Sequence, residues 1–488
     1  MFAALGAFLV AGCSDREPLQ KVAPKEQRVV ILHTNDIHGR VRPGGPVPGI
    51  AALAAHLKKA RAEARAAGAK VIVIDCGDFF QGTPEGDLTR GRLVVECMNA
   101  IGYDALCLGN HDFDLGPKVT EELKALARFP FLGANVFRKG SRDPPDWVAS
   151  SVYFEDVNLE IAGLTTSDMP NVTTARAREG LAFELEEPVL ERFPWRKDAI
   201  RVLATHIGAG RDRDLATKFR FAAILGGHSH SKVAEKIGDV QLLQSQCWGI
   251  LVGRLELTIR DGAVVSVEAT HETVDRRVED AAVKAIVAKY APEIDKVMDE
   301  VVGELAQDLP SGSRERVESS PLGNHLTDAM RASCDAAVAL HNRTGIRAGL
   351  RKGVQRLRDI YTVSPFGNTI VVVTMTGADL WALLEGSLGD GTRLLLEMSG
   401  AEIVFDPGAE KGKRLVSVSV GGKPLDRAGR YRVATNSFLA EGGDGHSPFV
   451  RGQDRKDTLV TLLEAHRAAL AKERPLRYEH RNRIVAKP

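Results

Sequence analysis

The chain has 488 residues, which is too long for one ordinary core and predicts two domains. Hydrophobic residues make up 44% of the chain and charged residues 26%, a composition typical of a soluble globular protein. The formal net charge is +1, so no strong basic field indicates a nucleic-acid polymer as a partner.

The N-terminal stretch MFAALGAFLVAGC is apolar and too short to span a bilayer, which needs about 20 residues. It is typical of the apolar part of a secretory signal, and LVAGC resembles the lipobox of bacterial lipoproteins, whose cysteine (here Cys13) is lipidated. No basic residue precedes the run, so a start further upstream or an accidental likeness stays open. We expect residues 1–26 to be signal and tether. The protein should then be exported to the periplasm or cell envelope, with a lipid at Cys13 as its only membrane contact.

The cysteines show no CxxC spacing of a zinc ribbon or redox motif. An oxidising compartment would allow one or two disulfides, but the spacing selects none. We favour buried thiols for Cys76, Cys97 and Cys107.

Five short apolar runs predict fully buried strands, at residues 28–32, 71–74, 105–108, 201–204 and 222–225. Between the first two lies an alanine-rich segment that predicts a helix, with Gly68 as its C-cap. Strand, helix and strand in alternation predict an α/β layer fold.

Each predicted strand is followed by residue types that bind metals. In open α/β sheets the carboxyl ends of the strands open onto the ligand crevice, so five such sets are hard to attribute to packing. Seven candidate ligands are too many for one tetrahedral site and predict two ions sharing a bridge, typically about 3.5–4 Å apart. The candidates are Asp36, His38, Asp78, Asn110, His206, His228 and His230.

Carboxylate plus imidazole suits Zn, Mn or similar ions rather than Ca or Mg. Asp78 is the candidate bridge, because its two oxygens could bind one ion each. Two such ions lower the pKa of a bound water and give a hydroxide at neutral pH.

Further along, residues 274–305 carry apolar residues at helical spacing, interrupted by Pro292. This pattern predicts two short helices or one kinked helix between the domains. Beyond it we expect helices near residues 322–333 and 377–388. We expect strands near residues 370–375, 415–420 and 431–435.

The motifs HTNDIHG, GD, GNHD, a lone histidine after a strand and GGHSH occur in this order and resemble the calcineurin-like metallophosphoesterases. HTNDIHGR, DCGDFFQGT and GNHDFD are similar to the bacterial 5'-nucleotidase branch of that family. The resemblance covers roughly residues 28–488. It implies an α/β fold with a four-layer αββα sandwich at 27–275, a helical linker at 276–308 and a C-terminal α+β substrate-binding domain at 309–488.

By resemblance, one ion takes Asp36, His38, Asp78 and His230, and the other takes Asp78, Asn110, His206 and His228.

The histidine of GNHD, His111, resembles the group that stabilises the transferring phosphoryl charge or protonates the leaving oxygen. Asp114 matches the partner that orients it. A structural histidine is the alternative. Asp112 receives no role beyond a loop or capping carboxylate.

Other polar residues are expected outside the ligand set. His33 and Asp75 should support the ligands. His56, His271 and His466 should lie on surfaces.

The C-terminal motifs SPFGN and NSFLAEGGDG resemble those that bind the nucleoside in the same family. Phe366 and Phe438 match two aromatics that clamp the base, with core packing as the alternative. Asp444 matches the acceptor of a ribose hydroxyl, and Asn368 a polar group beside the base.

Arg347 and Arg316 resemble the phosphate-binding arginines of the family. Arg314 is an alternative to Arg316. Asn342 matches the asparagine of the family's NGGGIR motif, which here reads NRTGIR. The bulkier Arg343 and Thr344 would alter how closely the backbone approaches a ligand.

The sequence therefore predicts an exported phosphohydrolase with two divalent ions that removes the 5'-phosphate of nucleotides. Alternatives are a 2',3'-cyclic nucleotide phosphodiesterase with 3'-nucleotidase activity and a UDP-sugar hydrolase. A thiosulfate-ester hydrolase is disfavoured, because GNHD is intact and both phenylalanines are present. A binding lipoprotein without turnover is disfavoured by His111 and Asp114. The sequence does not select the metal, the base or the oligomeric state.

Overall fold

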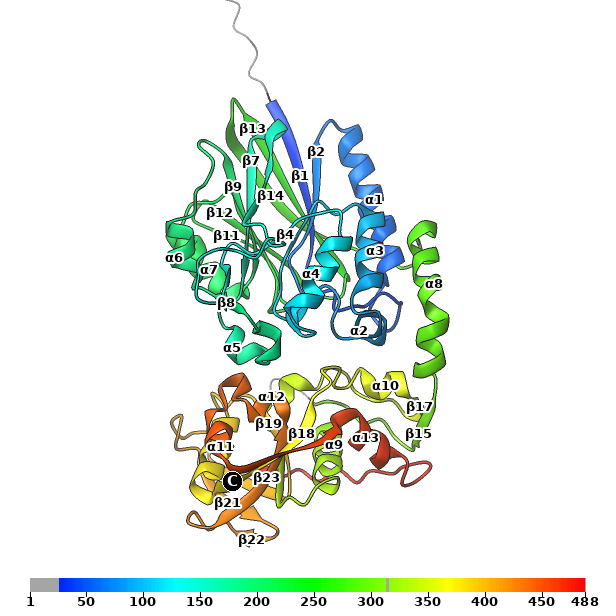
Figure 1. The fold of residues 1–488 in the computed structure, drawn as a ribbon, viewed down its shortest axis with the longest axis vertical. Helices are drawn as coiled ribbons and strands as arrows, with labels where there is room; N and C mark the ends of the chain where they lie inside the picture. The colour runs from blue at the N-terminus through cyan, green and yellow to red at the C-terminus, as the bar shows by residue number, and fades with distance from the viewer. Residues whose placement is uncertain (1–25, 313–315, 488) are drawn as a thin grey trace, which may run out of the picture.

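The computed structural model describes residues 26–312 and 316–487. Cys13, nearly all of the expected signal and tether, and Arg314 lie outside the described residues. Figure 1 shows an N-terminal part above a C-terminal part, with helix α8 (Ala281–Met298) running down one side between them.

The first sheet of the N-terminal part contains the first three predicted strands. Its order is β14-β13-β1-β2-β3-β4, and β1 to β4 run parallel. Its strands are β1 (Glu26–Thr34), β2 (Lys70–Asp75), β3 (Ala105–Cys107), β4 (Phe131–Leu132), β13 (Leu251–Arg260) and β14 (Ala263–Thr273).

The second sheet contains the other two predicted strands, in the order β11-β12-β10-β9-β7-β6. Its inner strands β12, β10, β9 and β7 are parallel. Its strands are β6 (Ser151–Phe154), β7 (Leu159–Thr165), β9 (Ile200–His206), β10 (Ala223–Gly226), β11 (Lys232–Ile237) and β12 (Val240–Ser245).

The two sheets pack face to face, with helices on both outer faces (Figure 1). Alternate residues of β1 show why: Val29 and Ile31 join the core between the sheets, while Val30 and Leu32 join the core under the helices. The four-layer αββα expectation is confirmed. The helices are α1 (Ile50–Ala66), α2 (Pro84–Leu88), α3 (Arg92–Ile101), α4 (Pro117–Leu126), α5 (Met169–Val172), α6 (Glu186–Glu191) and α7 (Ala209–Lys218); β5 (Val136–Arg138) pairs with β8 (Leu181–Phe183).

The segment between the two parts is one helix rather than two. Asp280 caps α8 by accepting a hydrogen bond from the backbone N–H of Val283, and Pro292 lies inside the helix. The expected helical linker to residue 308 is wrong beyond Met298, because β15 (Val301–Leu305) pairs with β17 (Gly353–Arg356). The β-branched Val301 and Val302 and the following glycine favour this strand over a longer helix.

The C-terminal part has a five-stranded sheet, order β19-β16-β23-β18-β24, and a four-stranded sheet, order β22-β21-β20-β25. The predicted helices and strands of this part are all present. Its remaining elements are α9 (Pro321–Ala332), β16 (Val338–Asn342), α10 (Leu357–Tyr361), β18 (Thr369–Thr376), α11 (Gly377–Ser387), β19 (Leu396–Ser399), β20 (Ala401–Phe405), β21 (Leu415–Val420), β22 (Lys423–Pro424), β23 (Arg430–Asn436), α12 (Ser437–Ala440), β24 (Gln453–Thr461), α13 (Leu462–Leu470) and β25 (Ile484–Ala486).

The two parts touch through polar side chains near α2 and α10. Tyr361 donates to Asp87 at 3.1 Å, and Gln81 donates to the backbone oxygen of Pro365 at 3.0 Å. Arg358 reaches Glu85 at 3.3 Å and Asp295 of α8 at 2.5 Å. These contacts hold the end of the first sheet against the C-terminal part.

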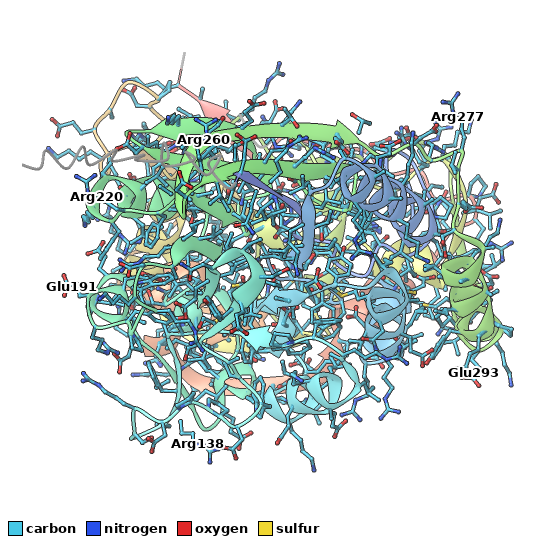
Figure 2. The ribbon with its side chains drawn as sticks, turned by 90° about the horizontal axis from the view of Figure 1, so that it is seen from above. Arg138, Glu191, Arg220, Arg260, Arg277 and Glu293 are labelled. Atoms are coloured by element: carbon cyan, nitrogen blue, oxygen red, sulfur yellow. The ribbon has the colours of Figure 1, made fainter. Side chains whose placement is uncertain are left out.

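The outer surface of the N-terminal part is charged. Seen from above, Arg220, Arg260, Arg277 and Glu293 lie at its rim (Figure 2).

Within the described residues, no helix combines the length and the apolar character needed to cross a membrane. Cys76, Cys97, Cys107 and Cys334 are free thiols, and the first three are buried as expected.

One histidine expected on the surface is buried. His466 of α13 is 1% exposed, and its ring lies 5.2 Å from that of His325 on α9, measured between centroids. Neither Nε2 atom has a hydrogen-bond partner within the described part of the chain. Burial lowers the pKa of both rings, that of His325 to about 4.

The free energy of unfolding should therefore fall as the pH drops below about 6.5. Histidines that are neutral when folded take up protons on unfolding, so this loss runs from the ordinary pKa of 6.5 to about 4. For His325 it amounts to on the order of 3 kcal/mol when complete. Urea unfolding at pH 7 and pH 5 measures it.

The variant His325→Leu should lose less stability between the two pH values than the parent. His56→Gln, at a partly exposed histidine of the N-terminal part, serves as the control. An unchanged pH dependence in His325→Leu would rule out the buried pair as its source.

Candidate active site

The polar residues that follow the parallel strands meet at the edge of the N-terminal part that faces the C-terminal part (Figure 1). They form two groups of candidate ligand atoms, in each of which all atoms lie within 4.8 Å of one another. The first group is Asp36, His38 and His230; the second is Asp78, His206 and His228.

In the first group, Nε2 of His230 lies 3.2 Å from Oδ1 of Asp36 and 3.1 Å from Nε2 of His38. Nδ1 of His38 lies 2.8 Å from the backbone oxygen of Gln81. That contact turns Nε2 toward the other two side chains, which is how a metal-binding imidazole is usually oriented.

In the second group, Nε2 of His206 lies 3.1 Å from Oδ2 of Asp78. Its Nδ1 lies 2.6 Å from the backbone oxygen of Cys76, which fixes the ring. Burial lowers the pKa of His206, but Asp78 and Asp36 outweigh it, and the pKa is raised.

Three of the converging atoms fit a metal site better than a hydrogen-bond network. Oδ1 of Asp36, Oδ1 of Asn110 and Nε2 of His206 are buried without a hydrogen-bond partner of acceptable geometry among the described residues. Buried polar atoms are rarely left in this state. Together with the clustering of ligand atoms within 4.8 Å in each group, these unsatisfied atoms favour a metal site.

The geometry of Asp78 differs from the expected bridge of two oxygens. Its Oδ1 accepts a hydrogen bond from the backbone N–H of His111 at 2.8 Å. Its Oδ2 alone faces both groups, at 3.1 Å from His206 and 3.8 Å from His38. Oδ2 is therefore the oxygen that Asp78 would offer to both candidate ions.

Five of the seven candidate ligands have left-handed backbone conformations, with φ between 50° and 77°. This conformation is uncommon for residues with a side chain and is concentrated at functional sites. The left-handed residues lie in the short loops that follow the strands, where the backbone turns sharply. The five are Asp36, His38, Asp78, His228 and His230.

The predicted pair of His111 and Asp114 is formed, with Nδ1 of His111 2.7 Å from Oδ2 of Asp114. Burial lowers the pKa of His111, but the charges of Asp114 and Asp78 outweigh it and raise the pKa. A raised pKa keeps the imidazole protonated closer to neutral pH. The His111 ring also stacks on Phe366 of the C-terminal part, with centroids 5.6 Å apart.

Asp112, which the sequence left without a specific role, joins two ligand loops. Its carboxylate accepts hydrogen bonds from the backbone N–H groups of Asp78 at 3.1 Å, Phe79 at 3.0 Å and Gly109 at 2.7 Å. Only glycine fits at position 109, because a Cβ there would lie 2.3 Å from Oδ1 of Asp78. Asp112 thus holds the loops of Asp78 and Asn110 against each other.

His33 and Asp75 are held by protein groups. The His33 ring lies 3.3 Å from the backbone oxygen of Gly226, and Asp75 accepts from Thr34 at 2.6 Å and from the backbone of Gly77 at 3.0 Å.

A cavity of about 310 Å³ extends from the ligands into the C-terminal part. Its volume is that of a small-ligand site. Most sequence-predicted substrate residues line it: Asn342, Arg347, Phe366, Asn368, Phe438 and Asp444.

Arg316 is not brought to this cavity: it is exposed and does not line the wall. Arg343, from the altered NRTGIR motif, turns the other way. Its buried guanidinium pairs with Glu397 at 3.0 Å. The extra bulk at position 343 is therefore absorbed by the core.

The cavity wall also contains residues that the sequence did not indicate. Ser229 lies between two candidate ligands and could have been suspected from its position. Residues 172–174, after α5, carry no pattern that marks them. The full set is Val172, Thr173, Thr174, Ser229 and Gly345, and Thr344 of the altered NRTGIR motif lines the wall as well.

Comparison with known families matches two models. Residues 29–232 match the calcineurin-like phosphoesterases, and residues 301–451 match the 5'-nucleotidase C-terminal domain. The crystal structure of a 5'-nucleotidase precursor from Thermus thermophilus is similar, with a TM-score of 0.83 and 29% identity over 94% of this chain and all of that one.

Two proteins of similar sequence differ in length. The 5'-nucleotidase of Vibrio cholerae is 27% identical over 90% of this chain and 89% of its own. The trifunctional nucleotide phosphoesterase YfkN of Bacillus subtilis is 28% identical over 88% of this chain, which spans only a third of that relative.

We expect Asp112→Asn to weaken metal binding and stability together. An amide nitrogen accepts no hydrogen bond, so at least one backbone N–H group would lose its acceptor, at about 1–3 kcal/mol. Displaced ligand loops should lower metal affinity by roughly 10–100-fold. Chelator competition and urea unfolding measure the two effects.

Glu121→Gln, the same charge change at an exposed position of α4, is the matched control. Metal affinity and stability of Asp112→Asn equal to those of this control would show that Asp112 does not hold the loops.

Proposed function

This chain belongs to the calcineurin-like phosphoesterases that carry a 5'-nucleotidase C-terminal domain, and we propose that it removes the 5'-phosphate of nucleotides. The protein is a metal-dependent phosphoric ester hydrolase. The observation that carries the proposal is one cavity lined by candidate metal ligands, by His111 and by aromatic and polar side chains of the C-terminal part.

We assign the phosphoesterase domain to residues 27–275 and, because β15 pairs with β17 of the C-terminal part, the substrate-binding domain to residues 301–488, with α8 in the linker between them. The active site then forms where the two domains meet, since neither supplies the whole cavity wall.

The two ions would be held by the seven ligands, with Asp78 shared. Two divalent ions would supply positive charge to the phosphoryl oxygens and lower the pKa of a coordinated water. The donor set of carboxylates, imidazoles and one amide suits Zn, Mn or a similar ion. The partnerless atoms of Asp36, Asn110 and His206 support this assignment.

His111 would act on the phosphoryl group or on the leaving oxygen. Asp114 holds Nδ1, so Nε2 is the atom available to the substrate. With a raised pKa, the ring can donate a proton or a charged hydrogen bond at that atom.

The nucleoside would lie between Phe366 and Phe438, which are half-buried and line the cavity. Stacking on an aromatic ring is worth about 1–3 kcal/mol per base. Asn368 would contact the base, Asp444 the ribose, and Arg347 the phosphate.

We also propose that the protein is exported and lipid-anchored at Cys13, on the strength of the apolar residues 1–13 and LVAGC. Fractionation of cells that express Cys13→Ser tests this directly, because the anchor predicts release of the variant from the membrane fraction.

We expect His111→Asn to bind both metals yet lose turnover by roughly 10²–10⁴-fold, since it removes the proton-donating group and no ligand. Metal analysis and steady-state kinetics measure this. Asp78→Ala, the comparison variant, should lose metal as well as turnover. Loss of metal in His111→Asn, or full turnover, would contradict the division of roles.

A substrate panel tests the proposed reaction. Phosphate release from nucleoside mono-, di- and triphosphates, a UDP-sugar, cyclic nucleotides and an aryl phosphate is compared with Mn, Zn and Co. We expect nucleoside 5'-monophosphates to have the highest kcat/KM.

In the same panel, Phe366→Ala and Phe438→Ala should each raise KM for nucleotides roughly tenfold. Phe219→Ala, which does not line the cavity, is the control. Hydrolysis of the aryl phosphate alone would contradict the nucleoside clamp, and highest efficiency on cyclic nucleotides or the UDP-sugar would select one of those reactions instead.

A further inference from the structure

Thr344 is bonded to Asp444 at the wall of the cavity. Its Oγ1 lies 2.8 Å from Oδ2 of Asp444. Nδ2 of Asn342, at the end of β16, lies 2.8 Å from the same Oδ2 and 2.8 Å from Oγ1 of Thr344. Nδ2 of Asn342, Oγ1 of Thr344 and Oδ2 of Asp444 thus form a triangle of mutual hydrogen-bond contacts.

The direction of these hydrogen bonds is fixed by two more residues. The backbone N–H of Leu439 donates to Oδ1 of Asn436 at 2.8 Å. This contact fixes which end of the Asn436 amide is oxygen, so its nitrogen is the atom that faces Asn342. That nitrogen donates to Oδ1 of Asn342 at 2.8 Å, which leaves the nitrogen of Asn342 for Asp444 and Thr344. A hydroxyl has one proton to donate, and the proton of Thr344 goes to Asp444.

One oxygen of Asp444 therefore already accepts two hydrogen bonds, both to an ionised acceptor and hence of the stronger kind. The remaining oxygen, Oδ1, is the better acceptor for a ligand. Ribose offers two neighbouring hydroxyls, and a carboxylate with both oxygens available can accept both of them. Here Oδ2 of Asp444, the second of these oxygens, already accepts hydrogen bonds from Asn342 and Thr344.

We propose that Thr344 limits Asp444 to one hydroxyl of the ribose diol, so that the protein tolerates nucleotides that lack the other hydroxyl. This inference rests on the proposed nucleotide hydrolysis and on Asp444 as the sugar acceptor. Thr344 is a positioning residue, because it acts through Asp444. The substrates it admits are 5'-monophosphates of ribonucleosides and of one class of deoxyribonucleosides.

The test compares kcat and KM for a nucleoside 5'-monophosphate and its 2'-deoxy and 3'-deoxy analogues. The proteins are the metal-loaded parent, Thr344→Val, which keeps the shape but removes the hydroxyl, and Thr344→Ser, which keeps the hydroxyl. Thr344 is exposed, so both variants should fold, and equal metal content and melting temperature verify this.

In the parent, kcat/KM for one of the two deoxy analogues should be less than about threefold below that for the full nucleoside 5'-monophosphate. In Thr344→Val the same analogue should lose roughly tenfold or more, through KM, because the freed oxygen now binds the second hydroxyl of the full substrate. Thr344→Ser should resemble the parent.

Equal penalties in all three proteins, or a tenfold loss for both analogues in the parent, would overturn the role of Thr344 while leaving nucleotide hydrolysis intact. A metal-loaded parent that hydrolyses no nucleotide would overturn the proposed function and this inference together.

Discussion

The burial of two carboxylates among imidazoles is the constraint on which the rest of the structure depends. Asp36 and Asp78 are no more than 2% exposed, and His206 is fully buried beside them. Isolated charges are very costly to remove from water, so such a group must be paired or must bind metal. Oδ1 of Asp36 and Nε2 of His206 lack a hydrogen-bond partner of acceptable geometry among the described residues, and cations would satisfy them. Binding of these cations would also offset the strain of the five left-handed ligand residues.

The topology of the two sheets brings these buried side chains together. Parallel strands of two stacked sheets end at one edge, and each contributes a short polar loop there. Asp112 ties two of these loops together through backbone N–H groups. The C-terminal part then faces the edge, and the stacking of Phe366 on His111 joins the C-terminal wall of the cavity to the wall that carries the candidate ligands.

The sequence predicted what depends on local order: buried strands, the residue types that follow them, and the aromatic and polar motifs of the second half. It missed what depends on distant partners. Val301 looked helical, but β17 (Gly353–Arg356), which is distant in the sequence, pairs with its strand. A lone His466 carried no sign of burial between two helices. Asp112 accepts hydrogen bonds from the backbone of Asp78 and Phe79, more than 30 residues earlier in the chain. The orientation of the Asp78 carboxylate depends on a hydrogen bond from the backbone of His111.

The central proposal is that two cations would share Asp78 through its Oδ2 at the edge between the two parts. Anomalous diffraction from crystals of the Mn- or Zn-loaded protein tests it most directly. We predict two peaks about 3.5–4 Å apart, both in bonding range of Oδ2 of Asp78, with Oδ1 still bonded to the backbone of His111. A single peak, or two peaks that share no oxygen of Asp78, would contradict the account.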